Sequence, residues 1–274
     1  MNNMFHGGNT MAKVTAATLA SLKKENKKFG TITAYDAAFA SLFDSCGVPP
    51  LLIGDSLGMV IQGAPSTLSV TADEIAYHVR CVASRAVNSL IIADMPFMTY
   101  NTPEKACSTA AKLMSAGAAM VKLEGGAWLC DTIRQLVRNG APVCGHLGLT
   151  PQSVNVFGGF KIQGRSDEDA ERLVNDAIAL EKAGASAIVL ECIPAALGKR
   201  ITQSVGIPTI GIGAGPDTDG QILVMHDAFG ITPGKTPKFA KNYLALTGNL
   251  EQAVKLYLKE VENGEFPSAE QSFS

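Results

Sequence analysis

Acidic or imidazole side chains stand at the ends of five apolar segments of this chain. These residues are Asp55, Asp94, Glu124, His146 and Glu191. Parallel strands that close into a barrel bring their carboxyl ends to one rim, where such side chains can share a metal ion or a substrate. The five positions therefore predict a single site.

The carboxylates of Asp55, Asp94 and Glu124 are candidate ligands for a hard divalent cation. Oxygen donors without a partnering His-Cys cluster suit Mg²⁺, which keeps waters and accepts chelating substrate oxygens. The structural alternative is that one or more of these acids caps a helix or pairs with Lys122.

Lys122 and Glu124 are two residues apart, so on a strand both side chains point to the same face. A cation beside a carboxylate cluster can bind a substrate carboxylate or a developing enolate oxygen. A structural ion pair explains the spacing equally well. A Schiff-base role is weaker, because the adjacent acids would keep the amine protonated.

His146 and Glu191 complete the set of candidate catalytic groups. His146 stands among glycines, where its imidazole can donate a hydrogen bond to a ligand, or it is a satisfied structural histidine. Glu191 follows four apolar residues. Such surroundings raise the pKa of a carboxylate toward the range of a general base, although a buried, hydrogen-bonded anchor would look the same.

Residues 211–220 (GIGAGPDTDG) are glycine-rich but match no nucleotide-binding motif. Pro216 occupies the third glycine position of GxGxxG, and Gln221 stands where a P-loop has lysine. In a barrel these glycines would let backbone amides approach a ligand at the rim. His226 and Asp227, at the end of the last apolar segment, are either functional or capping residues.

Short apolar segments alternate with longer amphipathic ones along the whole chain. The expected strands are Ile32–Tyr35, Leu51–Gly54, Leu90–Ala93, Met120–Leu123, Val143–Gly145, Ala187–Leu190, Thr209–Ile212 and Ile222–Met225. The expected helices between them are Ala37–Ser45, Ala72–Ala86, Pro103–Ala116, Trp128–Asn139, Ser166–Ala183 and Ala195–Val205.

This alternation in 274 residues, 46% of them hydrophobic, predicts an α/β fold of the (β/α)8 TIM barrel type. We expect an N-terminal helix, a C-terminal helical extension, and one catalytic domain over residues 13–274 that follows a disordered lead-in over residues 1–12. A doubly wound open sheet would show the same alternation, but the scattered rim residues favour closure.

Glycines between the expected helices and strands support this assignment. Helices are expected to end at glycines in the left-handed conformation, namely Gly47, Gly117, Gly140, Gly184 and Gly206. Two further segments lie outside the alternation. Residues 150–165 form a long insertion that would lie over the mouth of the barrel as a lid or substrate loop. Residues 244–262 have helical spacing and would pack on the barrel exterior or on a neighbouring subunit.

Composition excludes several classes of protein. The 23 Lys and Arg against 25 Asp and Glu give a net charge of −2, which favours neither nucleic acid nor an anionic membrane. No segment reaches the roughly 18–20 apolar residues of a membrane span, and no secretory signal is visible. Six cysteines without CxxC spacing predict reduced, mostly buried thiols. We therefore expect a cytoplasmic protein that acts on a small polar substrate.

Several stretches in order resemble the ketopantoate hydroxymethyltransferase family, over residues 22–273. They are TITAYD (31–36), GDSLGM (54–59), ADMPFM (93–98), VKLEGG (121–126), CGHLGLTPQSVN (144–155), LECIP (190–194), GIGAG (211–215) and DGQILVMHDAFGI (219–231). The resemblance implies a TIM barrel enzyme of pantothenate and coenzyme A biosynthesis. It would transfer a hydroxymethyl group from 5,10-methylenetetrahydrofolate to α-ketoisovalerate (3-methyl-2-oxobutanoate), giving ketopantoate through an enolate that Mg²⁺ stabilises.

The resemblance also implies residue roles. Asp55, Asp94 and Glu124 would hold Mg²⁺. The keto acid would be bound by Asp55, Ser56, Asp94 and Lys122, hydrogen-bonded by His146, and deprotonated by Glu191, the proton acceptor. The family forms homo-oligomers, commonly decamers, so the resemblance implies one here.

One stretch departs from the family pattern. The family commonly reads DSTLPVT after the second strand, whereas this chain has PSTLSVT over residues 65–71, which loses an acidic residue and moves the proline. Two other functions remain open on the sequence. One is a folate-independent, Mg²⁺-dependent aldolase or lyase of 2-oxo acids, and the other is a non-catalytic barrel whose rim groups are structural.

Overall fold

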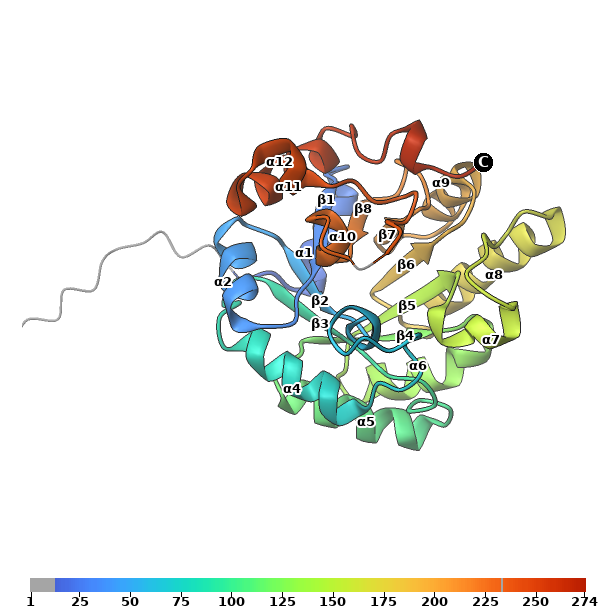
Figure 1. Ribbon diagram of the computed structural model, residues 1–274. Helices are drawn as coiled ribbons and strands as arrows, with labels where there is room; N and C mark the ends of the chain where they lie inside the picture. The colour runs from blue at the N-terminus through green and yellow to red at the C-terminus, as the bar shows by residue number, and fades with distance from the viewer. Residues whose placement is uncertain (1–12, 233) are drawn as a thin grey trace, which may run out of the picture.

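Eight parallel strands close into a barrel, as the sequence predicts. The computed structural model describes residues 13–232 and 234–274, so the expected lead-in over residues 1–12 lies outside the described residues. Each strand pairs with the next, and β8 pairs with β1 (Figure 1). The strands are β1 (Phe29–Thr33), β2 (Pro50–Ile53), β3 (Leu90–Asp94), β4 (Met120–Glu124), β5 (Val143–Gly148), β6 (Ala187–Glu191), β7 (Thr209–Ile212) and β8 (Gly220–Leu223).

Helices surround the barrel (Figure 1). The longer ones are α1 (Ala16–Lys24), α2 (Ala37–Ser45), α4 (Ala72–Ala83), α5 (Pro103–Ser115), α6 (Cys130–Arg138), α8 (Asp167–Ala183), α9 (Ala195–Ser204) and α12 (Leu250–Glu262). The short ones are α3 (Leu57–Val60), η1 (Ala127–Leu129), η2 (Pro151–Ser153), α7 (Val154–Phe157), α10 (Met225–Ala228), α11 (Tyr243–Thr247) and η3 (Ala269–Gln271).

The first and last strands differ most from their predicted bounds. In the structure β1 begins at Phe29, whereas the prediction began it at Ile32. Strand β8 ends at Leu223, whereas the prediction ended it at Met225. The two strands pair with Phe29 opposite Gly220 and Ile32 opposite Leu223, so their mutual register fixes both ends. Apolar composition alone placed both segments two or three residues too late.

Two apolar layers hold the barrel together. Inward-facing side chains, among them Ile92, Met120 and Ile210, fill its interior, and Leu19 of α1 packs against them. A larger layer lies between the strands and the outer helices. Because the inner layer fills the barrel below the strand ends, the space for a ligand is left at the carboxyl-terminal rim.

Most of the predicted helix ends are confirmed by their cap geometry. Thr71 and Glu74 form a capping box at the start of α4, so the altered stretch 65–71 leads into an intact helix. Gly117 and Gly184 have the positive φ angles expected after α5 and α8. The prediction for Gly206 is wrong, because α9 is followed by Val205 in an extended conformation (φ −125°).

The C-terminal extension packs on the barrel exterior. The predicted helix over residues 244–262 is two helices, α11 and α12, separated at Gly248, whose φ is +66°. The Oη atom of Tyr257 in α12 lies 2.8 Å from both Thr31 O of β1 and Gln221 O of β8. The chain joins β7 to β8 through residues 213–219 without a helix, and α12 covers the barrel beside β1 and α2.

All six cysteines are free thiols. The prediction that most of them are buried is wrong, because Cys144 and Cys192 are buried and the other four are half-buried. Within the described ranges, no helix is long and apolar enough to cross a membrane.

Candidate active site

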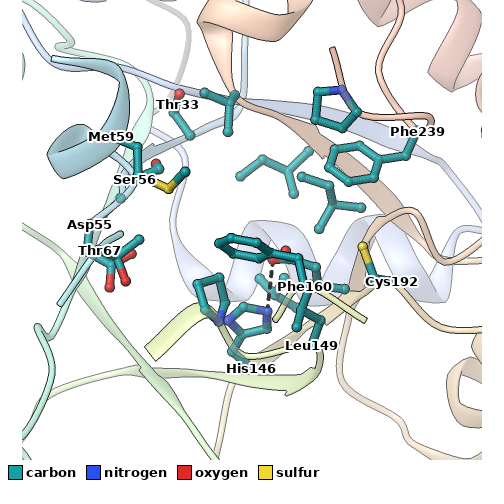
Figure 2. Close-up of a pocket in the computed structure, with 18 of the residues that line it drawn as sticks. Thr33, Asp55, Ser56, Met59, Thr67, His146, Leu149, Phe160, Cys192 and Phe239 are labelled. Atoms are coloured by element: carbon teal, nitrogen blue, oxygen red, sulfur yellow. Dashed lines mark ion pairs between the residues drawn. The ribbon is translucent and has the colours of Figure 1, made fainter. Parts of the chain in front are cut away.

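A cavity of about 1070 Å³ opens at the carboxyl-terminal ends of the strands. All seven residues assigned a role from the sequence line it: Asp55, Ser56, Asp94, Lys122, Glu124, His146 and Glu191. Figure 2 shows Asp55 and Ser56 on one side of this cavity and His146 on another. Barrel closure therefore brings together side chains that are up to 136 positions apart in the sequence, from Asp55 to Glu191.

Asp55, Asp94 and Lys122 form the first part of the site. The Asp55 N–H donates to Asp94 Oδ2 over 3.1 Å, and Lys122 Nζ donates to Asp94 Oδ1 over 2.6 Å. All three side chains are buried. Lys122 also lies 3.8 Å from Glu124 Oε1, which agrees with the predicted shared face of the strand. The Lys122 ion pair that the sequence left open as a structural alternative is present.

Glu124, His146 and Glu191 form the second part. His146 Nδ1 lies 3.1 Å from Glu124 Oε1, and His146 Nε2 lies 3.3 Å from Glu191 Oε2. The second contact is an ion pair rather than a hydrogen bond, because Nε2 finds no hydrogen-bond partner in the part of the chain that the structure describes. Figure 2 marks an ion pair of His146 with a dashed line. The imidazole thus stands between two carboxylates.

Burial and neighbouring charges shift the pKa values of Asp55 and Lys122. Burial, together with the nearby Asp94 and Glu124 carboxylates, raises the pKa of Asp55 well above its ordinary value. Burial alone would lower the pKa of Lys122, but the three surrounding carboxylates raise it above its ordinary value. Lys122 is therefore a permanent cation at neutral pH, which excludes it as a neutral amine nucleophile.

His146 is also a cation at neutral pH. Burial and the Lys122 charge lower its pKa, but Glu124 and Glu191 outweigh them and raise the pKa to about 9. Burial raises the pKa of Glu124, whereas His146, Lys122 and the Gln152 backbone lower it, and the net direction is downward. The pair is thus an imidazolium beside a carboxylate, and His146 can donate a proton or hydrogen bond but cannot accept one.

The charge of the deep cavity fits a divalent cation. Four carboxylates face one ammonium group and one imidazole there. With all six groups ionised, two negative charges remain unbalanced. Oxygen-only donors are the set that Mg²⁺ prefers. Over residues 13–232 and 234–274, however, no three His, Cys, Asp or Glu side chains are already arranged to hold a metal ion.

Three further residues belong to the site although sequence reasoning did not assign them a role. Gln152 and Tyr100 are buried behind the carboxylates and hydrogen-bonded to each other over 2.5 Å. Thr67, in the altered stretch 65–71, lines the cavity, and its buried hydroxyl has no hydrogen-bond partner in the described chain. Gln152 stands in the stretch CGHLGLTPQSVN, which is the signal that could have identified it.

Distant segments close the mouth of the cavity. Phe160, Lys161 and Ile162 from the predicted lid line it, and Phe160 projects over His146 in Figure 2. Phe239 and Phe273, from the residues after β8 and from the C-terminal tail, also line it. These aromatic and aliphatic side chains make the outer cavity mostly apolar, in contrast to its charged floor.

The other two sequence candidates lie at the edge of the cavity or outside it. Ile212 lines the cavity, and Gly213 packs against Phe239 and Phe273, which line it too, so the approach of these backbone amides to a ligand stays a prediction. His226 and Asp227 do not line the cavity, and Asp227 accepts a hydrogen bond from Thr232 Oγ1 over 2.5 Å. For Asp227 the structural reading is the one that the contacts support.

Comparisons with known proteins agree on one family. The family model described as ketopantoate hydroxymethyltransferase matches residues 13–269. A 3-methyl-2-oxobutanoate hydroxymethyltransferase of Aeromonas salmonicida is 61% identical over 96% of this chain and 100% of its own length. Proteins of the same name from Shewanella loihica and Colwellia psychrerythraea are 60% and 61% identical over the same shares of both chains.

Solved structures with lower identity share the fold. Phosphonopyruvate hydrolase in complex with oxalate and Mg²⁺ has a TM-score of 0.61 at 14% identity, over 94% of this chain and 93% of that chain. A 2,3-dimethylmalate lyase of the PEP mutase/isocitrate lyase superfamily has a TM-score of 0.58 at 20% identity, over 79% and 83%. At these identities the likeness concerns the barrel alone.

Proposed function

The chain belongs to the ketopantoate hydroxymethyltransferase family, and we propose that this enzyme transfers a hydroxymethyl group from 5,10-methylenetetrahydrofolate to 3-methyl-2-oxobutanoate. The product would be ketopantoate. The proposal rests on one observation. All seven residues to which the family resemblance gives a role line one cavity at the rim of the barrel. Relatives about 60% identical over their full length have the same activity in their names.

The reaction needs a base that removes the proton from the branched carbon of the keto acid. Glu191 is the candidate, because its side chain is 16% exposed to the cavity whereas that of His146 is 2% exposed. His146, with its pKa raised to about 9, is already protonated. We therefore assign proton abstraction to Glu191. The imidazolium 3.3 Å away would hold the Glu191 carboxylate in place and donate a hydrogen bond to the substrate.

The keto acid itself would be held on the charged floor of the cavity. Lys122 supplies a fixed positive charge for the substrate carboxylate and for the enolate oxygen that develops as the proton leaves. Ser56, whose Oγ is 2.8 Å from Tyr35 Oη, offers a positioned hydroxyl. We propose that Asp55, Asp94 and Glu124 hold Mg²⁺, which when bound would act as a Lewis acid toward the keto acid.

The apolar outer cavity suits the folate co-substrate. The whole cavity, with a volume of about 1070 Å³, is slightly larger than ordinary ligand pockets of roughly 300–1000 Å³, which supports the binding of two substrates together. Phe160, Phe239 and Phe273 offer flat apolar surfaces for the pterin and its neighbouring ring. Exclusion of water by these walls would protect the enolate until it attacks the one-carbon unit.

The folate-independent lyase is the weaker candidate. The lyase and hydrolase names belong to structures of 14–20% identity, which share the fold.

We also propose that residues 13–274 form a single catalytic domain and that the protein is cytoplasmic. We propose a homo-oligomer as well, which in this family is commonly a decamer.

The test is ketopantoate formation by the purified protein from 3-methyl-2-oxobutanoate, 5,10-methylenetetrahydrofolate and Mg²⁺. Parallel reactions would omit the folate, add EDTA, or restore Mg²⁺ after EDTA. We expect product only with folate, its loss with chelator, and its return with Mg²⁺. Turnover of the keto acid without folate would favour the lyase, and no product from folded, Mg²⁺-loaded protein would refute the transferase.

A further inference from the structure

Gln152 is buried directly behind the carboxylates of the site. It lies in η2, four residues after the end of β5, and is 5% exposed. Its Nε2 donates to Asp55 Oδ2 over 2.8 Å and to Met95 O over 3.0 Å. Its backbone N–H donates to Glu124 Oε2 over 3.0 Å. One residue thus contacts two of the three proposed metal ligands without lining the cavity itself.

The surroundings allow only one orientation of the Gln152 amide. Met95 O is a carbonyl and can only accept, so the atom facing it must be the NH₂ group. The amide oxygen accepts from Tyr100 Oη over 2.5 Å on the other side. Tyr100 Oη in turn lies 3.3 Å from the Glu124 N–H, which donates to it. The amide is therefore locked, and its two protons are committed to Asp55 and Met95.

This arrangement links the ends of two strands that do not touch. Asp55 follows β2 and Glu124 ends β4, and β3 lies between them in the barrel. Gln152 occupies Oδ2 of Asp55 and Oε2 of Glu124, so that Oδ1 of Asp55 is left free of its contact and Oε1 of Glu124 faces His146 Nδ1. Because an amide is neutral, it restrains the carboxylates without cancelling their charge. A lysine or arginine in the same place would cancel part of it.

We infer that Gln152 is a positioning residue that restrains the Asp55 and Glu124 side chains and so promotes the binding of a divalent cation, with Tyr100 fixing its amide. The inference rests on the proposed function, since it concerns the same metal site. Groups that hydrogen-bond to metal-ligating carboxylates commonly change metal affinity by about 10–100-fold when removed. A residue that served packing alone would change stability and leave metal affinity intact.

The experiment compares Gln152→Met with Gln62→Met. Methionine keeps the volume and length of the side chain but removes its hydrogen bonds. Gln62 is the matched control, because its Nε2 also donates to a carboxylate, Glu74 Oε1 at 2.9 Å, but on the exposed surface. Mn²⁺ affinity would be measured by electron paramagnetic resonance and Mg²⁺ affinity by calorimetry, each with 3-methyl-2-oxobutanoate present and no folate.

We expect Gln152→Met to weaken Mn²⁺ and Mg²⁺ binding about 10–100-fold and Gln62→Met to leave both unchanged. Wild-type affinity in folded Gln152→Met would overturn the inference. If that variant does not fold, Tyr100→Phe decides, because it removes the hydroxyl that donates to the Gln152 amide oxygen and accepts the Glu124 N–H. Weaker metal binding in Tyr100→Phe supports the inference, and unchanged binding overturns it. Wild-type protein that binds neither metal would instead refute the metal site of the proposed function.

Discussion

Gly148, the last residue of β5, passes the backbone of Glu191 too closely for any side chain. Its φ is +92°, and a Cβ built there would overlap Glu191 O and lie 2.8 Å from Ile193 Cγ2. The same Glu191 carbonyl accepts the Leu149 N–H over 2.8 Å. Substitution of Gly148 by alanine must therefore displace the backbone that carries the proposed base.

Gly140 provides the control for the magnitude of this effect. Its φ is +87°, nearly the same, but a Cβ there meets no atom of the described residues within 4 Å. Backbone strain from an unfavourable φ costs about 1–3 kcal/mol, and we expect this loss for Gly140→Ala. Gly148→Ala adds an overpacking cost of about 1–3 kcal/mol, so its free energy of unfolding should fall by about 2–6 kcal/mol in total.

The two variants should differ more in activity than in stability. A shift of about 1 Å in a catalytic group costs on the order of 10²-fold in rate, so kcat of Gly148→Ala should fall by about that factor while kcat of Gly140→Ala stays near wild type. Urea-induced unfolding and steady-state ketopantoate formation measure the two quantities. Equal kcat values for the two folded variants would refute the argument that Gly148 sets the position of Glu191.

Three further outcomes follow from the contacts. Glu191→Gln should lower kcat by about 10²–10⁴-fold, because an amide cannot accept the proton. A kcat within tenfold of wild type in steady-state assays would exclude Glu191 as the base. Tyr257→Phe should lower the free energy of unfolding, measured in urea, by about 1–3 kcal/mol, because it leaves the carbonyls of Thr31 and Gln221 without the tyrosine hydroxyl as donor. An unchanged free energy of unfolding would mean that both carbonyls find other partners. Phe273→Ala should raise KM for the folate more than KM for the keto acid, since the ring lines the outer wall. Equal changes in both KM values would argue against a folate wall there.

The sequence by itself determined the barrel and the floor of the site. Strand ends are local features, and in a closed parallel sheet they must meet at one rim. Asp94, Glu124 and Glu191 are the last residues of their strands, so their position could be predicted without knowledge of any contact. The common face of Lys122 and Glu124 followed from the two-residue period of a strand in the same way.

Only the tertiary structure decided how these groups are held and enclosed. Gln152 contacts residues 28 and 97 positions away, and its bond to Tyr100 spans 52 positions. The cavity wall likewise joins residues 160–162 to Phe273 at the end of the chain. Hydrogen bonds and walls of this kind depend on which loops meet above the closed barrel. The spacing of residues within one element does not predict contacts between loops, because the period of a strand or helix extends only as far as the element itself.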